Sequence, residues 1–271
     1  MDEIKAEELS ALIQVIHEKT GLNFAKEKEK FLKKKVVEAL DTLGFRTASD
    51  LLESTNSDVA FVYQLVNIFT RESHEMFSPV GQWLSLKEDL LEMAGRKKKL
   101  RVWHVGCSAG EELFTLNIIL EELGIRPSFK FLVTDMNEEA LIRSASGRYK
   151  TEDIQQYQNR FTRYDNQGDL KKYFHLEGSI ACMNPNLLQN VRFRKHNFIF
   201  EQMNEQFDLI LCREGMDYLD QVEQRKILKK FHKNLLSKGL FVSNFSEARP
   251  LIPDSSLYVP KNPESGIFYK N

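Results

Sequence analysis

The stretch RVWHVGCSAGEELF at residues 101–114 decides the fold. Its apolar residues through Val105 predict a short strand, the run 106–110 predicts a tight turn, and a helix is expected from Glu111. The two glycines of the turn let the backbone pass close to a ligand where a side chain would block it. The turn also leaves free amide groups at the start of the helix. This pattern is typical of a ligand-binding strand–turn–helix unit.

Two acidic residues, Glu111 and Glu112, stand at the start of this helix. In dinucleotide-binding proteins the same position faces a pyrophosphate, which neighbouring carboxylates would repel. The acids favour a cationic ligand instead, such as an amino acid with an ammonium and a sulfonium group. The alternative is a plain strand-to-helix turn whose acids complement the helix dipole.

A second acidic position follows in FLVTDMN at 131–137, where Asp135 ends the next predicted strand. An acid at this place is suited to hold the ribose hydroxyls of a nucleotide cofactor. The alternative is an aspartate that caps the following helix. Together, the turn and the acid predict a cofactor that contains a nucleoside.

Strands and helices alternate through most of the chain after Gly95. Such alternation implies a parallel sheet with helices on both faces, an α/β fold. The alternation stops between about 150 and 197, where a polar stretch with several aromatics predicts an inserted subdomain. The expected strands are 100–105, 129–134, 207–212 and 239–244, and the expected helices are 111–123, 138–146 and 221–236.

Helices are expected throughout residues 4–95. Leu9, Leu12, Ile13 and Ile16 fall on one helical face, and Gly21 ends that helix. The other helices expected here are 26–43, one capped by Thr47, and 59–68. The chain is therefore predicted to have an all-α domain at 1–90 and an α/β domain at 91–271 with an insert near 150–197.

The composition excludes several classes of protein. A net charge of −1 over 271 residues argues against nucleic-acid binding. The three cysteines form no CxxC pair, so neither a metal site nor a disulfide framework is expected. The first residues lack the apolar block of a signal peptide, and no stretch approaches the roughly 18 apolar residues that span a bilayer. We expect a cytoplasmic protein without membrane insertion.

The stretch FDLILCREGMDYLD at 207–220 places charged residues after a third buried strand. Arg213 and Glu214 emerge at the carboxyl end of this strand, where open α/β sheets bind their ligands. Tyr218 follows five residues later. The alternatives are a surface arginine and an aromatic residue at the margin of the core.

These pieces, in this order, resemble the chemotaxis receptor methyltransferase (CheR-type) family over nearly the whole chain. Several linked motifs are more specific than any one alone. The stretches that carry the resemblance are GCSAGEELFTLNIILEELG, TDMNEEALIRSASGRY, FDLILCREGMDYLD, LLSKGLFVSNFSEA, FLKKKVVEALDTLGFRTASDLLE and the IFYKN terminus.

The resemblance implies a helical amino-terminal domain and a Rossmann-like domain with a small β-subdomain. It implies methyl transfer from S-adenosylmethionine, which leaves S-adenosylhomocysteine, to glutamates of a receptor's helical region. By position, Glu111 would hold the amino-acid part of the cofactor, Asp135 the ribose, and Asn197 with Phe198 the adenine. The catalytic residues would be Arg213 and Tyr218. The full set of implied cofactor residues is Glu72, His74, Gly106, Cys107, Ser108, Gly110, Glu111, Asp135, Met136, Asn197, Phe198, Arg213 and Glu214.

The chain departs from the family pattern at 70–78, where Glu72 replaces an asparagine, His74 a threonine or serine, and Ser78 an arginine. Glu214 replaces another asparagine, and Asp217 adds an acid before the tyrosine. Like charges that are desolvated together are costly, so an acidic substrate would be repelled.

These departures leave three alternatives to glutamate methylation. The first is a catalytically degenerate module that binds S-adenosylmethionine or S-adenosylhomocysteine as a sensor or scaffold. The second is a methyltransferase with a less acidic acceptor. The third is a nicotinamide-dependent dehydrogenase, which Glu111 opposes.

A cluster of lysines on the second predicted helix is the candidate docking surface for the receptor. It comprises Lys30, Lys33, Lys34 and Lys35, which are expected to point outward. The alternative is an ordinary solvated helix face.

Overall fold

The computed structural model describes residues 4–70, 75–213, 215–244, 254–262 and 264–271. By internal packing the chain divides into two compact units. The first comprises Met1–Glu72, Ile199–Glu201 and Gly215–Gln224, and the second comprises the rest. The predicted domain boundary at residue 90 stays a prediction. No helix in these described ranges is long and apolar enough to cross a membrane.

The first unit contains four helices of the described amino-terminal region, which confirms its all-α character. They are α1 (Ala6–Thr20), α2 (Glu29–Leu43), α3 (Ala48–Ser57) and α4 (Val59–Thr70). Leu12 and Ile16 of α1 are fully buried, as their spacing predicts. Gly21 and Gly44 end α1 and α2 with φ of 83° and 76°, a conformation that glycine adopts without strain.

The lysine cluster on α2 does not point outward as a whole. Lys30 and Lys34 are exposed, and Lys33 is half-buried beside Glu29. Lys35 is only 7% exposed and forms an ion pair with Glu38 at 3.2 Å. The expectation that Lys35 belongs to the outward surface is therefore wrong, because the helical period turns it toward the buried side of α2.

The second unit is built on a seven-stranded sheet with the strand order β6-β2-β1-β7-β8-β10-β9. The first five strands are parallel, and β10 and β9 are antiparallel to their neighbours. This confirms the predicted Rossmann-like α/β fold and adds three strands that the sequence did not predict (β6, β9 and β10). The bounds are β1 (Leu100–Val105), β2 (Phe129–Asp135), β6 (Val191–Lys195), β7 (Phe207–Cys212), β8 (Leu235–Ser243), β9 (Tyr258–Pro260) and β10 (Ile267–Lys270).

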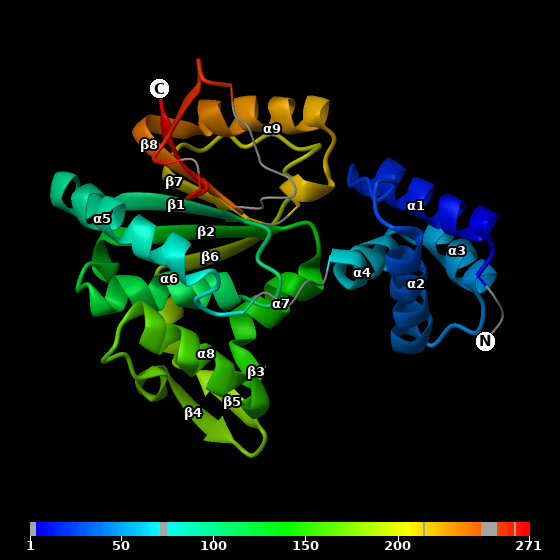
Figure 1. Ribbon diagram of the computed structural model, residues 1–271, viewed down its shortest axis with the longest axis horizontal. Helices are drawn as coiled ribbons and strands as arrows, with labels where there is room; N and C mark the ends of the chain where they lie inside the picture. Colours follow the sequence, from blue (N-terminus) through cyan, green and yellow to red (C-terminus); the bar gives the residue numbers. More distant parts are fainter. Residues whose placement is uncertain (1–3, 71–74, 214, 245–253, 263) are drawn as a thin grey trace. The chain divides into compact units, whose positions relative to one another are not determined.

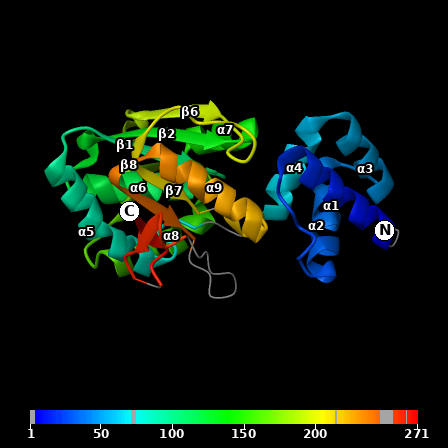
Figure 2. The same cartoon turned by 90° about the horizontal axis from the view of Figure 1, so that it is seen from above.

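Helices cover both faces of this sheet (Figure 1). Alternation along β1 sends Val102 into the core shared with α5 and α6, and sends Trp103 to the other face. There the Trp103 ring meets Phe231 of α9 edge-on at 5.4 Å, and Figure 2 shows α9 lying over β7 and β8. The helices are α5 (Val80–Arg96), α6 (Glu111–Glu122), α7 (Glu138–Ser146) and α9 (Gln221–Asn234), with short 3-10 turns at Arg126–Ser128, Leu170–Tyr173 and Pro185–Leu188. A further 3-10 turn, Met216–Tyr218, and the first turn of α9 belong to the first unit.

The predicted β-subdomain is present as a three-stranded antiparallel sheet with the order β3-β5-β4. Its strands are β3 (Arg148–Lys150), β4 (Phe174–Glu177) and β5 (Ile180–Met183), and α8 (Thr151–Tyr164) connects β3 to the rest. The 150–197 stretch also contains β6, which pairs with β2 in the large sheet.

Candidate functional site

The turn between β1 and α6 has the backbone conformation that its glycines predict. Gly106, Ser108 and Gly110 have φ of 73°, 48° and 94°. A Cβ atom on Gly110 would lie 2.7 Å from Oγ of Ser144 and 3.0 Å from its Cα, so any larger residue would collide with α7. Glycine is therefore required where the start of α6 approaches α7.

Asp135 at the end of β2 holds this turn in place. Its carboxylate accepts hydrogen bonds from the backbone N–H groups of Cys107 and Asn137, both at 2.9 Å. Burial raises the pKa of Asp135, and the N–H groups of Asn137, Cys107 and Ser108 oppose that rise. The alternative of a helix-capping aspartate is wrong, because Asn137 is the N-cap of α7. The ribose role of Asp135 stays a prediction.

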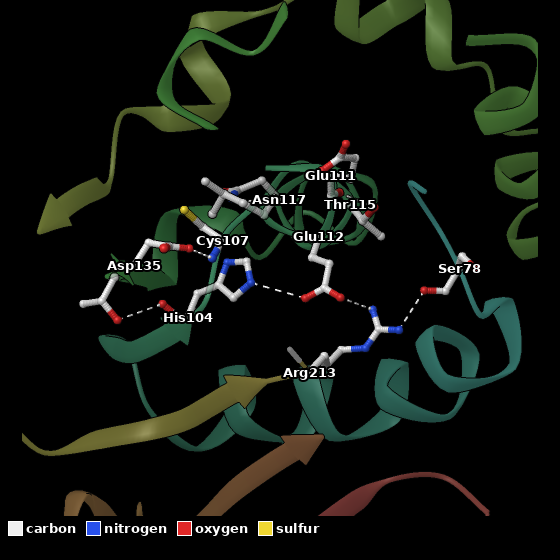
Figure 3. Close-up of polar contacts among 11 residues, drawn as sticks. Ser78, His104, Cys107, Glu111, Glu112, Thr115, Asn117, Asp135 and Arg213 are labelled. Atoms are coloured by element: carbon white, nitrogen blue, oxygen red, sulfur yellow. Dashed lines mark hydrogen bonds and ion pairs between the residues drawn. The ribbon is translucent and has the colours of Figure 1, made fainter. Parts of the chain in front are cut away.

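A row of three buried side chains joins β1, α6 and the end of β7 (Figure 3). Glu112 stands in the middle, with Oε2 3.3 Å from Nε2 of His104 and Oε1 2.8 Å from a terminal nitrogen of Arg213. The exposed fractions of His104, Glu112 and Arg213 are 1%, 5% and 5%. The surface-arginine alternative for Arg213 is therefore wrong.

Two further groups fix the Arg213 guanidinium. It donates a hydrogen bond of 2.9 Å to the Ser78 carbonyl, and it lies 5.3 Å from the ring centre of Trp83 on α5. Such a cation–aromatic contact adds to the ion pair. Arg213 is thus contacted by Trp83 of α5, by Glu112 of α6 and by Ser78 of the segment before α5.

Glu111 and Glu112 are neighbours in the chain but point to different sides of α6. Figure 3 shows the Glu111 carboxylate across the helix from the His104–Glu112–Arg213 row. The pKa of Glu111 is raised to about 7: burial is the largest cause and the charges of Glu112 and Asp153 add to it, while a backbone hydrogen bond at Glu111 itself and the charge of Arg143 oppose the rise. Glu111 therefore changes its charge close to neutral pH, and its role stays a prediction.

The remaining predicted residues fall into four groups. Asn197 and Phe198 are 5% exposed, and the Phe198 ring stacks on Phe231 at 6.1 Å. Tyr218 belongs to the first unit, where its ring lies 4.6 Å from Phe24. Cys107 and Met136 are buried beside the turn. Glu72, His74 and Glu214 lie outside the described residues.

His104 was not singled out from the sequence, and Glu112 was considered only jointly with Glu111, as an acid that favours a cationic ligand. A signal for Glu112 existed in the acidic pair at 111–112. Successive helical residues are about 100° apart, so only one of two adjacent acids can face the strand ends. No sequence signal marked His104, which stands as a single histidine in a short strand of mostly apolar residues.

Several buried polar atoms at this edge of the sheet have no hydrogen-bond partner among the described residues. They are His104 Nδ1, Glu111 Oε2, Asn137 Nδ2 and Ser144 Oγ. Buried polar groups are rarely left without partners, so these atoms fit a polar ligand. Together with the carboxylates of Glu112 and Asp135, they suit a cationic nucleoside at the carboxyl ends of the strands.

The fold defines a Rossmann-like α/β protein with a candidate ligand site at the carboxyl ends of its parallel strands. The family model described as "CheR methyltransferase, SAM binding domain" matches residues 71–254. By family and by fold, the chain belongs to the CheR methyltransferases, which confirms the resemblance and the cofactor.

Three curated relatives match along most of their length. The Cher3 protein of Pseudomonas putida is 25% identical over 264 residues, 97% of each chain. The chemotaxis protein methyltransferase of Salmonella typhimurium is 28% identical over 255 residues, 87% of this chain and 82% of its own. That of Listeria monocytogenes is 24% identical over 238 residues, 86% of this chain and 87% of its own.

Proposed function

We propose that this protein transfers the methyl group of S-adenosylmethionine to glutamate side chains of a chemoreceptor-like helical protein. The family match and the names of the relatives from Salmonella and Listeria support this acceptor. The observation that carries the proposal is the buried Glu112–Arg213 pair at the carboxyl ends of β1 and β7. The pair places two charged groups at one edge of the sheet: a carboxylate, which attracts a cationic cofactor, and a guanidinium, which attracts an anionic acceptor.

The cofactor would be held by groups from three strand ends. When bound, it supplies an electrophilic methyl group on a positively charged sulfur. We assign the ribose hydroxyls to Asp135 and the amino-acid part to Glu111, while Glu112 positions Arg213. Asn197 and Phe198, which follow β6, would flank the adenine.

The acceptor needs position more than activation. A carboxylate is already a competent nucleophile at neutral pH, so this chain would mainly orient it and exclude water. Arg213 would draw the acceptor carboxylate into line through charge-assisted hydrogen bonds, in competition with Glu112. The resemblance assigns Tyr218, which lies in the first unit, a hydrogen bond to the acceptor.

One observation favours the degenerate alternative, in which the protein binds S-adenosylmethionine or S-adenosylhomocysteine without transfer. The Arg213 guanidinium already contacts Glu112, the Ser78 carbonyl and the Trp83 ring. In this alternative Arg213 serves only to connect α5, α6 and β7, and the protein acts as a sensor or scaffold.

Two measurements on the full chain separate these functions. Calorimetric titration with the cofactor and its product tests binding, and transfer of labelled methyl to receptor fragments tests catalysis. We expect both, with label that alkali releases as methanol because the product is an ester. Matched fragments with glutamine in place of the acceptor glutamates should stay unlabelled. Binding without transfer would select the degenerate module, and alkali-stable label would select a different acceptor.

The exposed part of the lysine cluster, Lys30 and Lys34 on α2, is the proposed contact with an acidic receptor segment. Reversal of both charges to glutamate should weaken receptor binding about tenfold at low salt, and less at high salt, because screening removes the attraction. The matched control reverses Lys98 and Lys99, which are also exposed but lie in the other unit. Equal losses for both variants would reject α2 as the docking surface.

A further inference from the structure

One face of the small sheet gathers four polar side chains from three strands, of which Cys182 is 6% exposed and the other three are exposed. Residue pairing places His175 of β4 opposite Cys182 of β5, and Cys182 opposite Arg148 of β3. Glu177 lies two residues after His175, so both side chains are on one face of β4. Side chains that are paired in this way lie within reach of each other.

The distances show that these groups converge. Nε2 of His175 lies 3.2 Å from Oε1 of Glu177, while a guanidinium nitrogen of Arg148 lies 2.8 Å from Oε2 of Glu177 and 3.1 Å from Sγ of Cys182. The ligand atoms of His175, Glu177 and Cys182 all lie within 4.8 Å of one another. A cation, the Arg148 guanidinium, is thus already seated between the carboxylate and the thiol.

We propose that this face is a Zn²⁺ site in which His175, Glu177 and Cys182 are three ligands and water is the fourth. Imidazole nitrogen, thiolate sulfur and carboxylate oxygen form a ligand set that zinc prefers. Bonds of about 2.0–2.3 Å in a tetrahedron place ligand atoms about 3.5 Å apart, which small side-chain rotations reach from the present spacing. The site departs from the sequence expectation of no metal, which rested on the missing CxxC pair.

The charges balance when the metal enters. The thiol of Cys182 gives its proton to solvent, and the thiolate and the Glu177 carboxylate then neutralise the two positive charges of the ion. The Arg148 guanidinium must move away from Glu177 and Cys182 when the metal binds. Its side chain is 48% exposed, so it can rotate toward the solvent. An exposed ion pair contributes little to stability, which makes this exchange inexpensive. The bound ion would tie the edge strand β4 to β5.

Cobalt titration of the metal-free full-length protein tests this site, because thiolate-bound Co²⁺ has a characteristic charge-transfer absorption. We expect one Co²⁺ per chain with this band, and its displacement by Zn²⁺. Cys182→Ser should abolish the band, and His175→Ala should weaken binding at least tenfold. Arg148→Ala should strengthen binding several-fold, a gain that loss of folding cannot produce. His17→Ala, which removes an exposed histidine of α1, is the matched control.

Three results would overturn the proposal. One is a wild-type protein without the thiolate–cobalt band. The second is a band that survives in Cys182→Ser, since it would then come from Cys107 or Cys212. The third is an affinity that Arg148→Ala leaves unchanged or lowers. The assay does not depend on methyl transfer, so its failure leaves the proposed function intact.

Discussion

Two regions of the second unit contain the same three residue types at nearly the same distances, yet in opposite environments. In the buried row, Glu112 contacts Arg213 at 2.8 Å and His104 at 3.3 Å. On the small sheet, Glu177 contacts Arg148 at 2.8 Å and His175 at 3.2 Å. The first row is at most 5% exposed, whereas the side chains of the second are 48–63% exposed.

The comparison teaches that burial, rather than contact geometry, decides what such a group can do. Water competes for every charge on the small sheet, so its contacts are weak and can be exchanged for a metal. Around Glu112 water is excluded, so removing one charge leaves its partner uncompensated. The buried row therefore resists the loss of any one of its charges, a property that supports the proposed cofactor site.

The largest expected difference comes from removing the central carboxylate of each region. Glu112→Ala should lower the free energy of unfolding by about 3–5 kcal/mol, because it leaves the Arg213 charge buried without its partner. Glu177→Ala, the matched change on the small sheet, should leave the urea midpoint nearly unchanged. Urea denaturation of both variants measures this. Equal midpoints for the two variants would show that burial does not separate the regions.

A second test uses the pH dependence of Glu111, which lies on the same helix as Glu112. Its pKa is raised from 4.5 to about 7, which means that the folded state disfavours the charged carboxylate. The neutral carboxyl group therefore contributes stability at low pH, and this contribution is lost as the pH rises from about 4.5 through 7. Glu111→Gln should therefore be more stable than wild type at pH 8, by up to about 3 kcal/mol, and similar to it at pH 4.5.

Urea denaturation of both proteins at the two pH values checks this expectation, since other titrating groups are common to both. A stability difference that does not change with pH would contradict the assignment of the neutral pKa to Glu111. Affinity for S-adenosylmethionine should rise between pH 6 and 7.5 in wild type, as the carboxylate becomes charged, and rise less in Glu111→Gln.

The smallest expected effect comes from exchanging each arginine for lysine. Arg213→Lys keeps the charge but loses the forked geometry that spans Glu112 and the Ser78 carbonyl, so it should cost about 1–2 kcal/mol. Arg148→Lys should have no measurable effect on the denaturation midpoint. If both exchanges are silent, the buried arginine is held by charge alone, and the position of its guanidinium does not matter.

Much of this site could be predicted from the sequence because local rules govern it. Gly106 and Gly110 mark a turn that needs positive φ, and Asp135 marks the end of a strand whose neighbour in the sheet ends at the same edge. Parallel strands bring such ends together whatever the rest of the chain does. The order of strands and helices then gave the α/β fold.

The rest depends on contacts between distant parts of the chain. The rotation of α6 about its axis decides whether Glu111 or Glu112 faces the strand ends. No local sequence pattern predicts that rotation, because it depends on how the helix packs against the sheet. The same applies to Lys35, whose neighbours on α2 are exposed. Strand β6, with the sequence VRFRK, is too polar to read as a buried strand. The cluster of His175, Glu177 and Arg148 around Cys182 forms only because of the register in which β3, β5 and β4 pair.

Calorimetric titration of wild type and Asp135→Ala with S-adenosylmethionine tests the central claim most directly, that the carboxyl edge of the sheet is built for a cationic nucleoside. We predict that the wild type binds one cofactor per chain and that the variant loses at least about 100-fold in affinity, equivalent to about 2.7 kcal/mol. A folded variant that binds as tightly as wild type, or a wild type that does not bind, would contradict this account.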